Sequence, residues 1–281
     1  MSGEYADQVE QILESVREAL CGFPFVAGIV LGGSRSRGMQ TAGSDIDIGI
    51  YYDADGLDLC ALNAAATELD DEGRDGLVVP PGEWGNWVNG GGWLTVDGFH
   101  VDLLLRELGR VRAVVEETER GIFSNNYQTG HFHGYMSCMY RGELAVSRLL
   151  WSRDQAFRDL KRQAEQYPEA LRKSLMGFFG FEAGFAISFA ASNAGSGDRY
   201  YVGGNLARSV SCMNQVLFAY NRVYCINEKK AVLMADSFPA VPEHYREKVN
   251  RIFEVLGTSP EESCALCARL NEEVQRVIGA E

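Results

Sequence analysis

The apolar positions of the first 120 residues alternate between helical and strand patterns. In residues 4–21 they recur every three or four positions, which predicts an amphipathic helix. Short apolar runs that stop at glycine or polar residues predict buried strands. These patterns place strands over 25–31, 46–52 and 99–105, and further helices over 57–69 and 108–119.

Two segments between these elements lack apolar periodicity. Residues 33–44 are rich in Gly, Ser, Arg and Thr, and residues 73–92 contain Pro80-Pro81, a high share of glycine and two tryptophans. Clusters of Gly and Pro favour loops. A loop as long as residues 73–92 inside a domain is usually functional, so we expect it to contribute to a site.

The pattern changes after about residue 122. From Tyr135 onward the apolar spacing predicts helices, and two prolines lie near predicted helix starts, where proline is tolerated. The predicted helices cover 141–151, 153–166, 168–192, 203–225, 242–256 and 260–279. Strands interleaved with helices and followed by a run of helices predict an α+β fold in two domains. We place a strand-containing domain at residues 1–122 and an all-α helical bundle at residues 123–281.

Composition narrows the class of protein. The 281 residues are 46% hydrophobic and 23% charged, as is typical of a globular protein. No stretch approaches the ~20 consecutive apolar residues of a membrane span, and the most apolar window, 178–191, is interrupted by Glu182 and glycines. The N-terminus lacks the basic region and apolar core of a signal peptide. An odd count of seven cysteines favours reduced thiols, so we expect a cytoplasmic protein that does not bind membranes.

The net charge of −13 disfavours binding to a nucleic-acid backbone over a broad surface. The absence of basic stripes disfavours template-directed polymerisation in the same way. An acidic surface suits a cationic small substrate better, although solubility alone explains the charge at least as well.

The sequence LGGSRSRG at residues 31–38 is the first part of a chemical pattern. A strand that ends at Gly33-Ser34 and turns into a short helix presents unpaired backbone N–H groups and a hydroxyl. Helix N-termini of this kind bind phosphate oxygens. The segment therefore predicts a phosphate-binding loop.

Three aspartates form the second part. Asp45 and Asp47 lie two positions apart on a predicted strand, so both carboxylates project from the same face. Such carboxylates repel each other unless they share cations, and Mg²⁺ prefers hard oxygen ligands. Asp102 lies in another, otherwise apolar strand, where an unpaired charge is unfavourable. Together the three would provide a two-metal site for in-line displacement at phosphorus. The alternative is a tight turn whose aspartates only cap and solubilise.

These motifs resemble the signature of the DNA polymerase β nucleotidyltransferase superfamily: Gly-Ser, a spacer, then Asp-hydrophobic-Asp on a strand. The string from Gly33 to Asp47 is similar to the bacterial branch that includes the kanamycin, streptomycin and lincosamide enzymes and the small toxin–antitoxin nucleotidyltransferases. The motif covers residues 31–52, and the third aspartate extends the match to about residue 105. The C-terminal half resembles the family only in being helical.

The resemblance implies a mixed-sheet domain that binds an NTP together with two Mg²⁺ ions. In that family the first two aspartates, here Asp45 and Asp47, bind both metals, and the third, here Asp102, binds the catalytic metal. The nucleotide-binding candidates are Gly33, Ser34, Arg35, Arg37 and Ser44. For Arg35 and Arg37 the physical argument is that arginine favours phosphate geometry. The alternative is an ion pair with Asp53 or Asp55.

Two glutamates are candidates for a general base near the acceptor hydroxyl. Glu83, in Gly82-Glu83-Trp84, precedes the third aspartate as the glutamate does in the streptomycin/spectinomycin-type enzymes. Glu143 opens the helical region as the glutamate does in the kanamycin enzyme. We favour Glu143, because a helix start facing a cleft is rigid. Either glutamate could instead be a solvated surface charge.

Three other groups of residues allow both functional and structural interpretations. Trp84, Trp87 and Trp93 could cover a flat or cationic substrate by stacking, or pack on the sheet edge. His131 and His133 have the spacing of metal ligands, but no third ligand stands nearby in the sequence, so we interpret them as polar or structural groups. Cys264 and Cys267 share a predicted helix and favour packing, because free cysteine behaves as a small hydrophobe.

The hypothesis is a magnesium-dependent nucleotidyltransferase that transfers a nucleoside monophosphate from an NTP to a hydroxyl and releases pyrophosphate. The acceptor is expected to be a small molecule, with an aminoglycoside- or lincosamide-like antibiotic as first choice. The site is expected between the two domains, where ligands favour binding. A homodimer is compatible with the sequence. The alternatives are adenylylation of a protein hydroxyl, as in toxin–antitoxin pairs, and a non-catalytic module that senses NTP.

Overall fold

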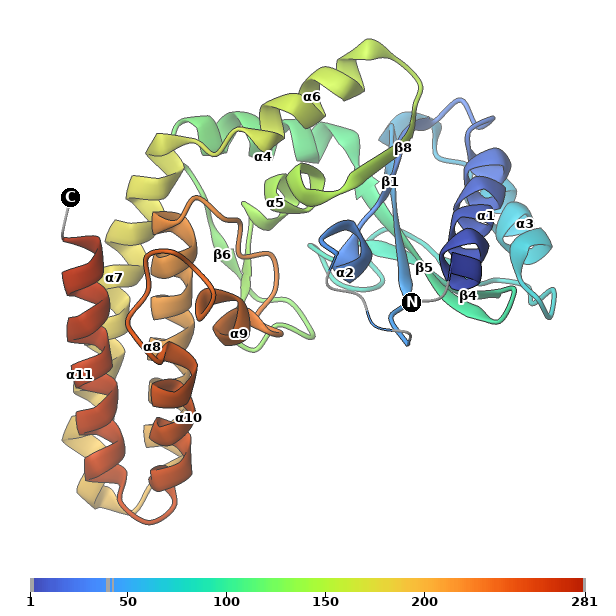
Figure 1. Cartoon of the computed structure of the whole chain (residues 1–281). Helices are drawn as coiled ribbons and strands as arrows, with labels where there is room; N and C mark the ends of the chain where they lie inside the picture. The colour runs from blue at the N-terminus through green and yellow to red at the C-terminus, as the bar shows by residue number, and fades with distance from the viewer. Residues whose placement is uncertain (1–2, 39–40, 42, 280–281) are drawn as a thin grey trace. The chain divides into compact units, whose positions relative to one another are not determined.

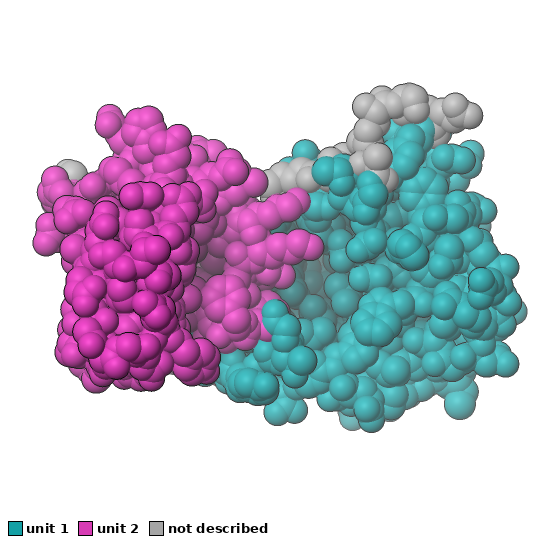
Figure 2. Space-filling view, turned by 90° about the horizontal axis from the view of Figure 1, so that it is seen from below, with its two compact units in different colours: residues 1–116, 124–130, 135–166 teal, residues 117–123, 131–134, 167–281 magenta. Residues whose placement is uncertain are grey.

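The computed structural model describes residues 3–38, 41 and 43–279. Residues 39, 40 and 42 of the predicted phosphate loop lie outside the described residues, as do the first two residues of the chain. The chain forms two compact units, coloured separately in Figure 2. Unit 1 comprises Met1–Glu116, Ser124–Gly130 and Tyr135–Gln166, and unit 2 comprises Glu117–Phe123, His131–Gly134 and Tyr167–Glu281.

These units differ from the division predicted at residue 122. Most of residues 124–166 belong with the N-terminal sheet, because a strand and two helices from this stretch pack on it. The fold is α+β, with a mixed sheet in unit 1 and helices in unit 2.

Unit 1 is built on a six-stranded sheet in the order β3-β4-β5-β2-β1-β8. In that order the strands are Val78–Val79, Gly90–Val96, Phe99–Glu107, Ile46–Tyr52, Val26–Leu31 and Arg148–Ser152. The central pair β2 and β5 is parallel, and the other neighbours are antiparallel. A second, two-stranded sheet pairs β6 (Asn125–Asn126) with β7 (Tyr135–Met136).

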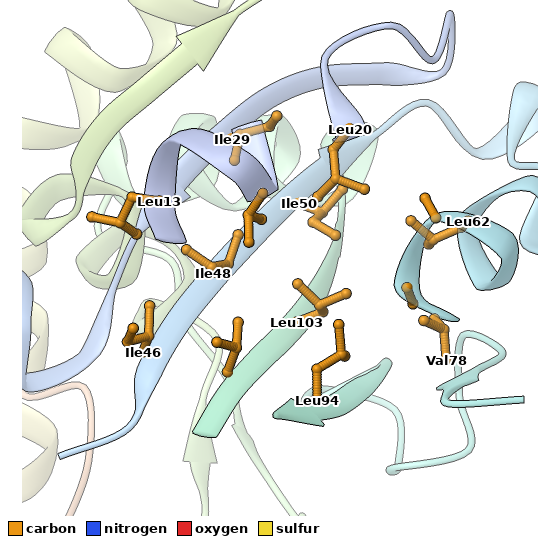
Figure 3. Close-up of a cluster of buried hydrophobic side chains, with 14 of the residues drawn as sticks. Leu13, Leu20, Ile29, Ile46, Ile48, Ile50, Leu62, Val78, Leu94 and Leu103 are labelled. Carbon is orange, nitrogen blue, oxygen red and sulfur yellow. The ribbon is translucent and has the colours of Figure 1, made fainter. Parts of the chain in front are cut away.

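One face of the six-stranded sheet carries the core of unit 1. Helices α1 (Gly3–Leu20) and α3 (Leu59–Leu69) supply apolar side chains to this face, among them Leu13 and Leu62 (Figure 3). The strands supply every second residue, for example Ile46, Ile48 and Leu103. Because side chains alternate along a strand, the residues between them project from the opposite face.

The opposite face is partly covered by α5 (Met139–Val146) and α6 (Gln155–Glu165). Phe157 of α6 packs edge-on against Tyr51, with ring centroids 5.1 Å apart, and occupies the space above Gly28. Arg141 of α5 is fully buried and donates to backbone carbonyls, including that of Gln166 at 2.6 Å. Its hydrogen bonds offset the cost of burying the charge and fix α5 in place.

Asp70, which follows α3, ties that helix to the sheet edge. Its carboxylate accepts hydrogen bonds from the backbone N–H of Thr95 at 2.9 Å and from the Arg74 side chain. The Arg74 guanidinium, followed by the Thr95 and Arg74 backbone donors, lowers the pKa of Asp70 below its ordinary value.

Unit 2 is a bundle of helices (Figure 1). Its helices are α7 (Glu169–Asn193), α8 (Arg199–Tyr220), α9 (Ala231–Ala235), α10 (Tyr245–Leu256) and α11 (Pro260–Ile278), and η2 (Ala194–Ser196) follows α7. Cys264 and Cys267 are buried on α11, and the Cys267 thiol donates to Ser209 of α8. The packing interpretation of this cysteine pair is confirmed.

Residues Glu169–Ser196 form a helix that is long and apolar enough to cross a membrane by length and composition. No stretch of this kind was expected from the sequence, since Glu182 interrupts the apolar run. Glu182 is ion-paired to Arg208 of α8, and Ala183 and Ala186 are buried. Length and composition also fit the core helix of a helical bundle, and α7 packs against α8 and α11.

The predicted elements match observed ones except in two places, and β6, β7 and α9 were not predicted. Residues 141–151 were predicted as one helix, but α5 ends at Val146 and β8 follows, because this segment pairs with β1 at the sheet edge. Residues 73–92 were predicted as a loop, but they contain β3 and the start of β4. In both cases strand pairing with distant residues overrides the local pattern. The remaining elements of unit 1 are α2 (Gly33–Ser36), η1 (Ala54–Gly56) and most of α4 (Leu108–Glu119).

Candidate active site

A tight turn between β1 and α2 forms the first part of the site. The Gly32 N–H donates to the Asp47 carbonyl at 2.8 Å, which joins the turn to the start of β2. Gly33 has a φ of +62°, and a Cβ at this position would lie 1.8 Å from Oδ2 of Asp47. Only glycine fits here, because the Asp47 carboxylate lies directly against the turn. The predicted candidate Ser34 follows in α2, partly exposed.

Arg35 holds the segment that leads into β2. Its Nε donates to the Asp45 carbonyl at 3.0 Å, and its guanidinium also donates to the Ser44 carbonyl and to Tyr5 Oη. Ser44 in turn accepts from the Thr41 N–H at 2.9 Å through its hydroxyl. The structure therefore gives Arg35 and Ser44 a positioning role, and their contact with phosphate stays a prediction. Arg37 follows α2 as its C-terminal cap.

Two of the three predicted aspartates, Asp47 and Asp102, lie on one face of the sheet, and Asp45 is near enough to act on both electrostatically. Asp47 of β2 and Asp102 of β5 are direct partners in the parallel pair, and Asp45 precedes β2 by one residue. Asp47 and Asp102 alternate with core residues, so they project from the face opposite the core. Among the described residues, none donates a hydrogen bond to any of the three carboxylates and none forms an ion pair with them.

The electrostatics of this cluster follow from that arrangement. The pKa of Asp47 is raised to about 6, first by burial and then by the negative charges of Asp102, Asp45 and Glu143, with Arg35 acting in the opposite direction. The pKa of Asp102 is also raised, by burial and by Asp45, and is lowered in part by His100. Asp47 and Asp102 therefore resist ionisation, first because they are buried and then because negative charges lie nearby.

A cation would relieve this repulsion, and the donor set suits a hard divalent ion. Carboxylate oxygens are the ligands that Mg²⁺ prefers, and Mg²⁺ keeps further positions for water and phosphate. No group of three His, Cys, Asp or Glu side chains in the part of the chain described here is arranged to hold a metal ion by itself.

Glu143 lies beside this cluster, on α5. Its carboxylate accepts hydrogen bonds from Nε of Arg106 at 2.7 Å, from a terminal nitrogen of Arg106 at 3.1 Å and from Tyr135 Oη at 3.2 Å. The Arg106 side chain is 5% exposed and the Glu143 side chain 26% exposed. Because Glu143 also raises the pKa of Asp47, its charge acts on the aspartate cluster. Glu143 is thus a fixed, partly exposed carboxylate of unit 1.

Glu83 is exposed in a turn that precedes β4. The following residue, Trp84, stacks on Trp93 with ring centroids 4.7 Å apart and planes inclined by 17°. Trp93 is the direct partner of Asp102 in the β4–β5 pair. The turn that carries Glu83 is therefore connected to the aspartate cluster through two tryptophans, whereas Glu143 acts on Asp47 electrostatically.

The loop around Trp87 is fixed by hydrogen bonds rather than open. The buried Gln128 side chain accepts from the Trp87 N–H at 3.0 Å and donates to the Trp84 carbonyl at 2.6 Å. Tyr140 Oη donates to the Trp87 carbonyl at 2.6 Å, and the Arg110 guanidinium lies 3.9 Å from the Trp87 ring centroid. The aromatic segment therefore packs on unit 1, as in the structural alternative, and Trp93 is its exposed member at 62%.

The histidine pair is part of unit 2, whereas the three aspartates belong to unit 1. His131 Nδ1 lies 2.8 Å from Glu228 Oε2, and the His133 ring is 3.8 Å from the Cys212 thiol. Burial, more than any other factor, lowers the pKa of His133. These contacts agree with the structural interpretation of both histidines.

Three residues around the site were not predicted from the sequence: Arg106, Tyr135 and Gln128. Each is a polar residue whose role depends on a partner 8 to 44 positions away along the chain. For Arg106 the sequence does contain a signal, because a charged residue at the end of an apolar strand needs a partner.

One comparison with known proteins matches the N-terminal part of the chain. Residues 9–123 match the family model described as a nucleotidyltransferase domain. Among solved structures, the chain is similar to a nucleotidyltransferase-like protein from Exiguobacterium sibiricum 255-15, at 11% identity and a TM-score of 0.46, over 97% of this chain and 75% of that one. No curated protein matches the sequence.

Proposed function

Residues 9–123 belong to the nucleotidyltransferase domain family, within the polymerase β-like superfamily, and on that premise we propose a magnesium-dependent transfer of a nucleoside monophosphate. The donor is an NTP, the acceptor is a hydroxyl, and pyrophosphate is released. The observation that carries the proposal is the pairing of Asp47 with Asp102 on the face of the sheet opposite the core, with Asp45 one residue before β2.

The residues present suit a divalent cation, and Asp45, Asp47 and Asp102 would hold it. Bound Mg²⁺ ions would neutralise charge on the phosphates and favour ionisation of the acceptor hydroxyl. The Gly32-Gly33 turn and the Ser34 hydroxyl would bind phosphate oxygens, while Arg35 keeps the Asp45 segment in place. The turn lies against Asp47, so phosphate and carboxylates would meet at one point.

In the reaction, an oxygen of the acceptor forms a bond to the α-phosphorus and the bond between that phosphorus and the bridging oxygen breaks. Pyrophosphate leaves with the electron pair. We propose that Glu143 receives the hydroxyl proton, because it is partly exposed and its charge reaches Asp47. Arg106 and Tyr135 would keep the carboxylate oriented. Glu83 is the rival base.

For the acceptor we propose a small molecule, with an aminoglycoside- or lincosamide-like antibiotic as first choice and antibiotic resistance as the consequence. Residues 123–281 would contribute acceptor selectivity, and the enzyme would act in the cytoplasm. The acidic net charge of −13 favours a cationic acceptor over nucleic acid. Transfer to a protein hydroxyl is the second candidate, because the same cluster would serve it.

The test is a screen of acceptors with each NTP and Mg²⁺, with pyrophosphate release and mass spectrometry of the product as readouts. Asp45→Asn and Asp102→Asn serve as controls, each expected to abolish turnover by removing a proposed metal ligand. Pyrophosphate release that persists in both variants would contradict the site. NTP binding without pyrophosphate release from any acceptor would favour the nucleotide-sensing alternative.

A further inference from the structure

Trp93 is an exposed aromatic side chain beside the aspartate cluster. It lies on β4 directly opposite Asp102 of β5, so the two side chains share one face of the sheet, with Cβ atoms about 5 Å apart. Its neighbour Leu94 points into the core, which places Trp93 on the same face as Asp47. At 62% exposure the indole remains accessible.

The indole is held from behind by Trp84. The two rings stack at 4.7 Å, and the Trp84 ring occupies the space above Gly91, where a Cβ would lie 2.7 Å from it. The Trp84 backbone is fixed in turn by Gln128 and by Asn89, whose carbonyl accepts from the Trp84 N–H at 3.0 Å. Trp93 is therefore a supported surface rather than a loose side chain, and ordering it on binding costs little entropy.

The position of Trp93 in the sheet separates it from the phosphate turn. The turn follows β1, Asp47 lies on β2, Asp102 on β5 and Trp93 on β4, which are consecutive strands. At a spacing of about 4.8 Å per strand, the turn and Trp93 lie roughly 14 Å apart, on opposite sides of the carboxylates.

In-line displacement at phosphorus places the attacking and leaving oxygens on opposite sides of the phosphorus atom. If the leaving pyrophosphate lies at the turn, the attacking hydroxyl enters from the side of Asp102 and Trp93. We propose that Trp93, supported by Trp84, is the surface on which the acceptor ring stacks, and that the acceptor is a hydroxylated cationic ring such as an amino sugar. This inference rests on the proposed function.

The chemistry of the indole selects this class. The face of an indole attracts C–H faces and cations, so a sugar ring that carries ammonium groups suits it. The net charge of −13 likewise favours a cationic acceptor over an anionic one.

The first experiment measures binding without turnover. All four tryptophans of the chain lie in unit 1, so their fluorescence reports this unit. The protein is titrated with kanamycin as the cationic amino-sugar probe and with methyl α-glucoside as the neutral probe, and calorimetry is run in parallel. We expect Trp93→Ala and Trp93→Leu to weaken kanamycin binding about 5- to 30-fold and Trp93→Phe to retain most of it, since a cation on a ring face gives about 1–2 kcal/mol.

The controls separate stacking from misfolding. Tyr127→Ala removes another exposed aromatic of unit 1, at 91% exposure, and should leave kanamycin affinity unchanged. MgNTP affinity should also be unchanged in Trp93→Ala, because the phosphate turn is three strands away. A parallel loss of MgNTP affinity or of thermal stability in Trp93→Phe would contradict a specific stacking role.

The second experiment distinguishes this inference from the proposed function. If wild-type protein releases pyrophosphate with an amino-sugar acceptor and Trp93→Ala keeps the same acceptor KM, the stacking surface is wrong and the function stands. If no acceptor supports pyrophosphate release but kanamycin binding still depends on Trp93, the binding surface stands and the proposed function is wrong. A raised acceptor KM in Trp93→Ala, restored by Trp93→Phe, supports both.

Discussion

Substitution of Asp47 by asparagine tests the electrostatic basis of the site through stability as well as activity. The pKa of Asp47 is raised to about 6 in the folded protein, chiefly by burial and then by Asp102 and Asp45. In the unfolded chain it is close to the ordinary 3.8. Between these values the folded state binds more protons than the unfolded state. The stability of the metal-free protein should therefore fall as the pH rises from about 4 to about 6.

The magnitude follows from the difference between the two pKa values. At about 1.4 kcal/mol per pKa unit, keeping Asp47 ionised in the metal-free fold costs about 3 kcal/mol above pH 6. Asparagine keeps the shape and carries no charge, so Asp47→Asn should be more stable than wild type at pH 8 by up to that amount. For a domain of this size this corresponds to roughly 6–12 °C in Tm. The two proteins should converge near pH 4.

The assay is thermal and urea unfolding followed by tryptophan fluorescence, which reports unit 1. With Mg²⁺ at about 100 times its Kd, wild-type protein should gain about 2.7 kcal/mol by mass action, whereas Asp47→Asn should gain little. Pyrophosphate release should be abolished in the same variant. If Asp47→Asn is less stable than wild type at pH 8 without metal, the idea of a mutually repelling carboxylate cluster is refuted.

Three further predictions follow from particular contacts. Gly33→Ala should lower the free energy of unfolding by at least about 1–2 kcal/mol and abolish pyrophosphate release, because its Cβ meets the Asp47 carboxylate and alanine disfavours a positive φ. A wild-type midpoint of urea unfolding together with near-normal turnover would contradict this. Glu143→Gln should lower kcat ~10²–10⁴-fold with unchanged MgNTP affinity, and the matched control Glu83→Gln should keep its activity. Full activity in Glu143→Gln with a loss of activity in Glu83→Gln would assign the base to Glu83. Asp70→Asn should lower Tm at pH 7 and reduce the dependence of the free energy of unfolding on pH below about pH 4. The reason is that the lowered pKa of Asp70 gives wild type a stabilisation that is lost as the pH falls through that range. The same pH dependence in both proteins would contradict it.

The sequence by itself determined the parts of the site that depend on local spacing. Asp45 and Asp47 share one stretch of chain, so their separation of two residues fixed their relation before any fold was known. The glycine turn before them was predicted for the same reason. The strands β1, β2 and β5 were also predicted, because a buried strand carries a continuous apolar run that needs no knowledge of its partners.

Tertiary structure alone decided which distant residues join that local pattern. β8 has a sequence that also fits a helix, and only pairing with β1 makes it a strand. The pairing of β5 with β2 on one side and β4 on the other places Asp102 beside Asp47 and Trp93 beside Asp102. The ion pair between Arg106 and Glu143 assigns Glu143 to unit 1 rather than to the helical bundle. Spacing along the chain fixes neighbours only within a strand or a helix turn, whereas these contacts join residues whose order in space is set by sheet register and packing.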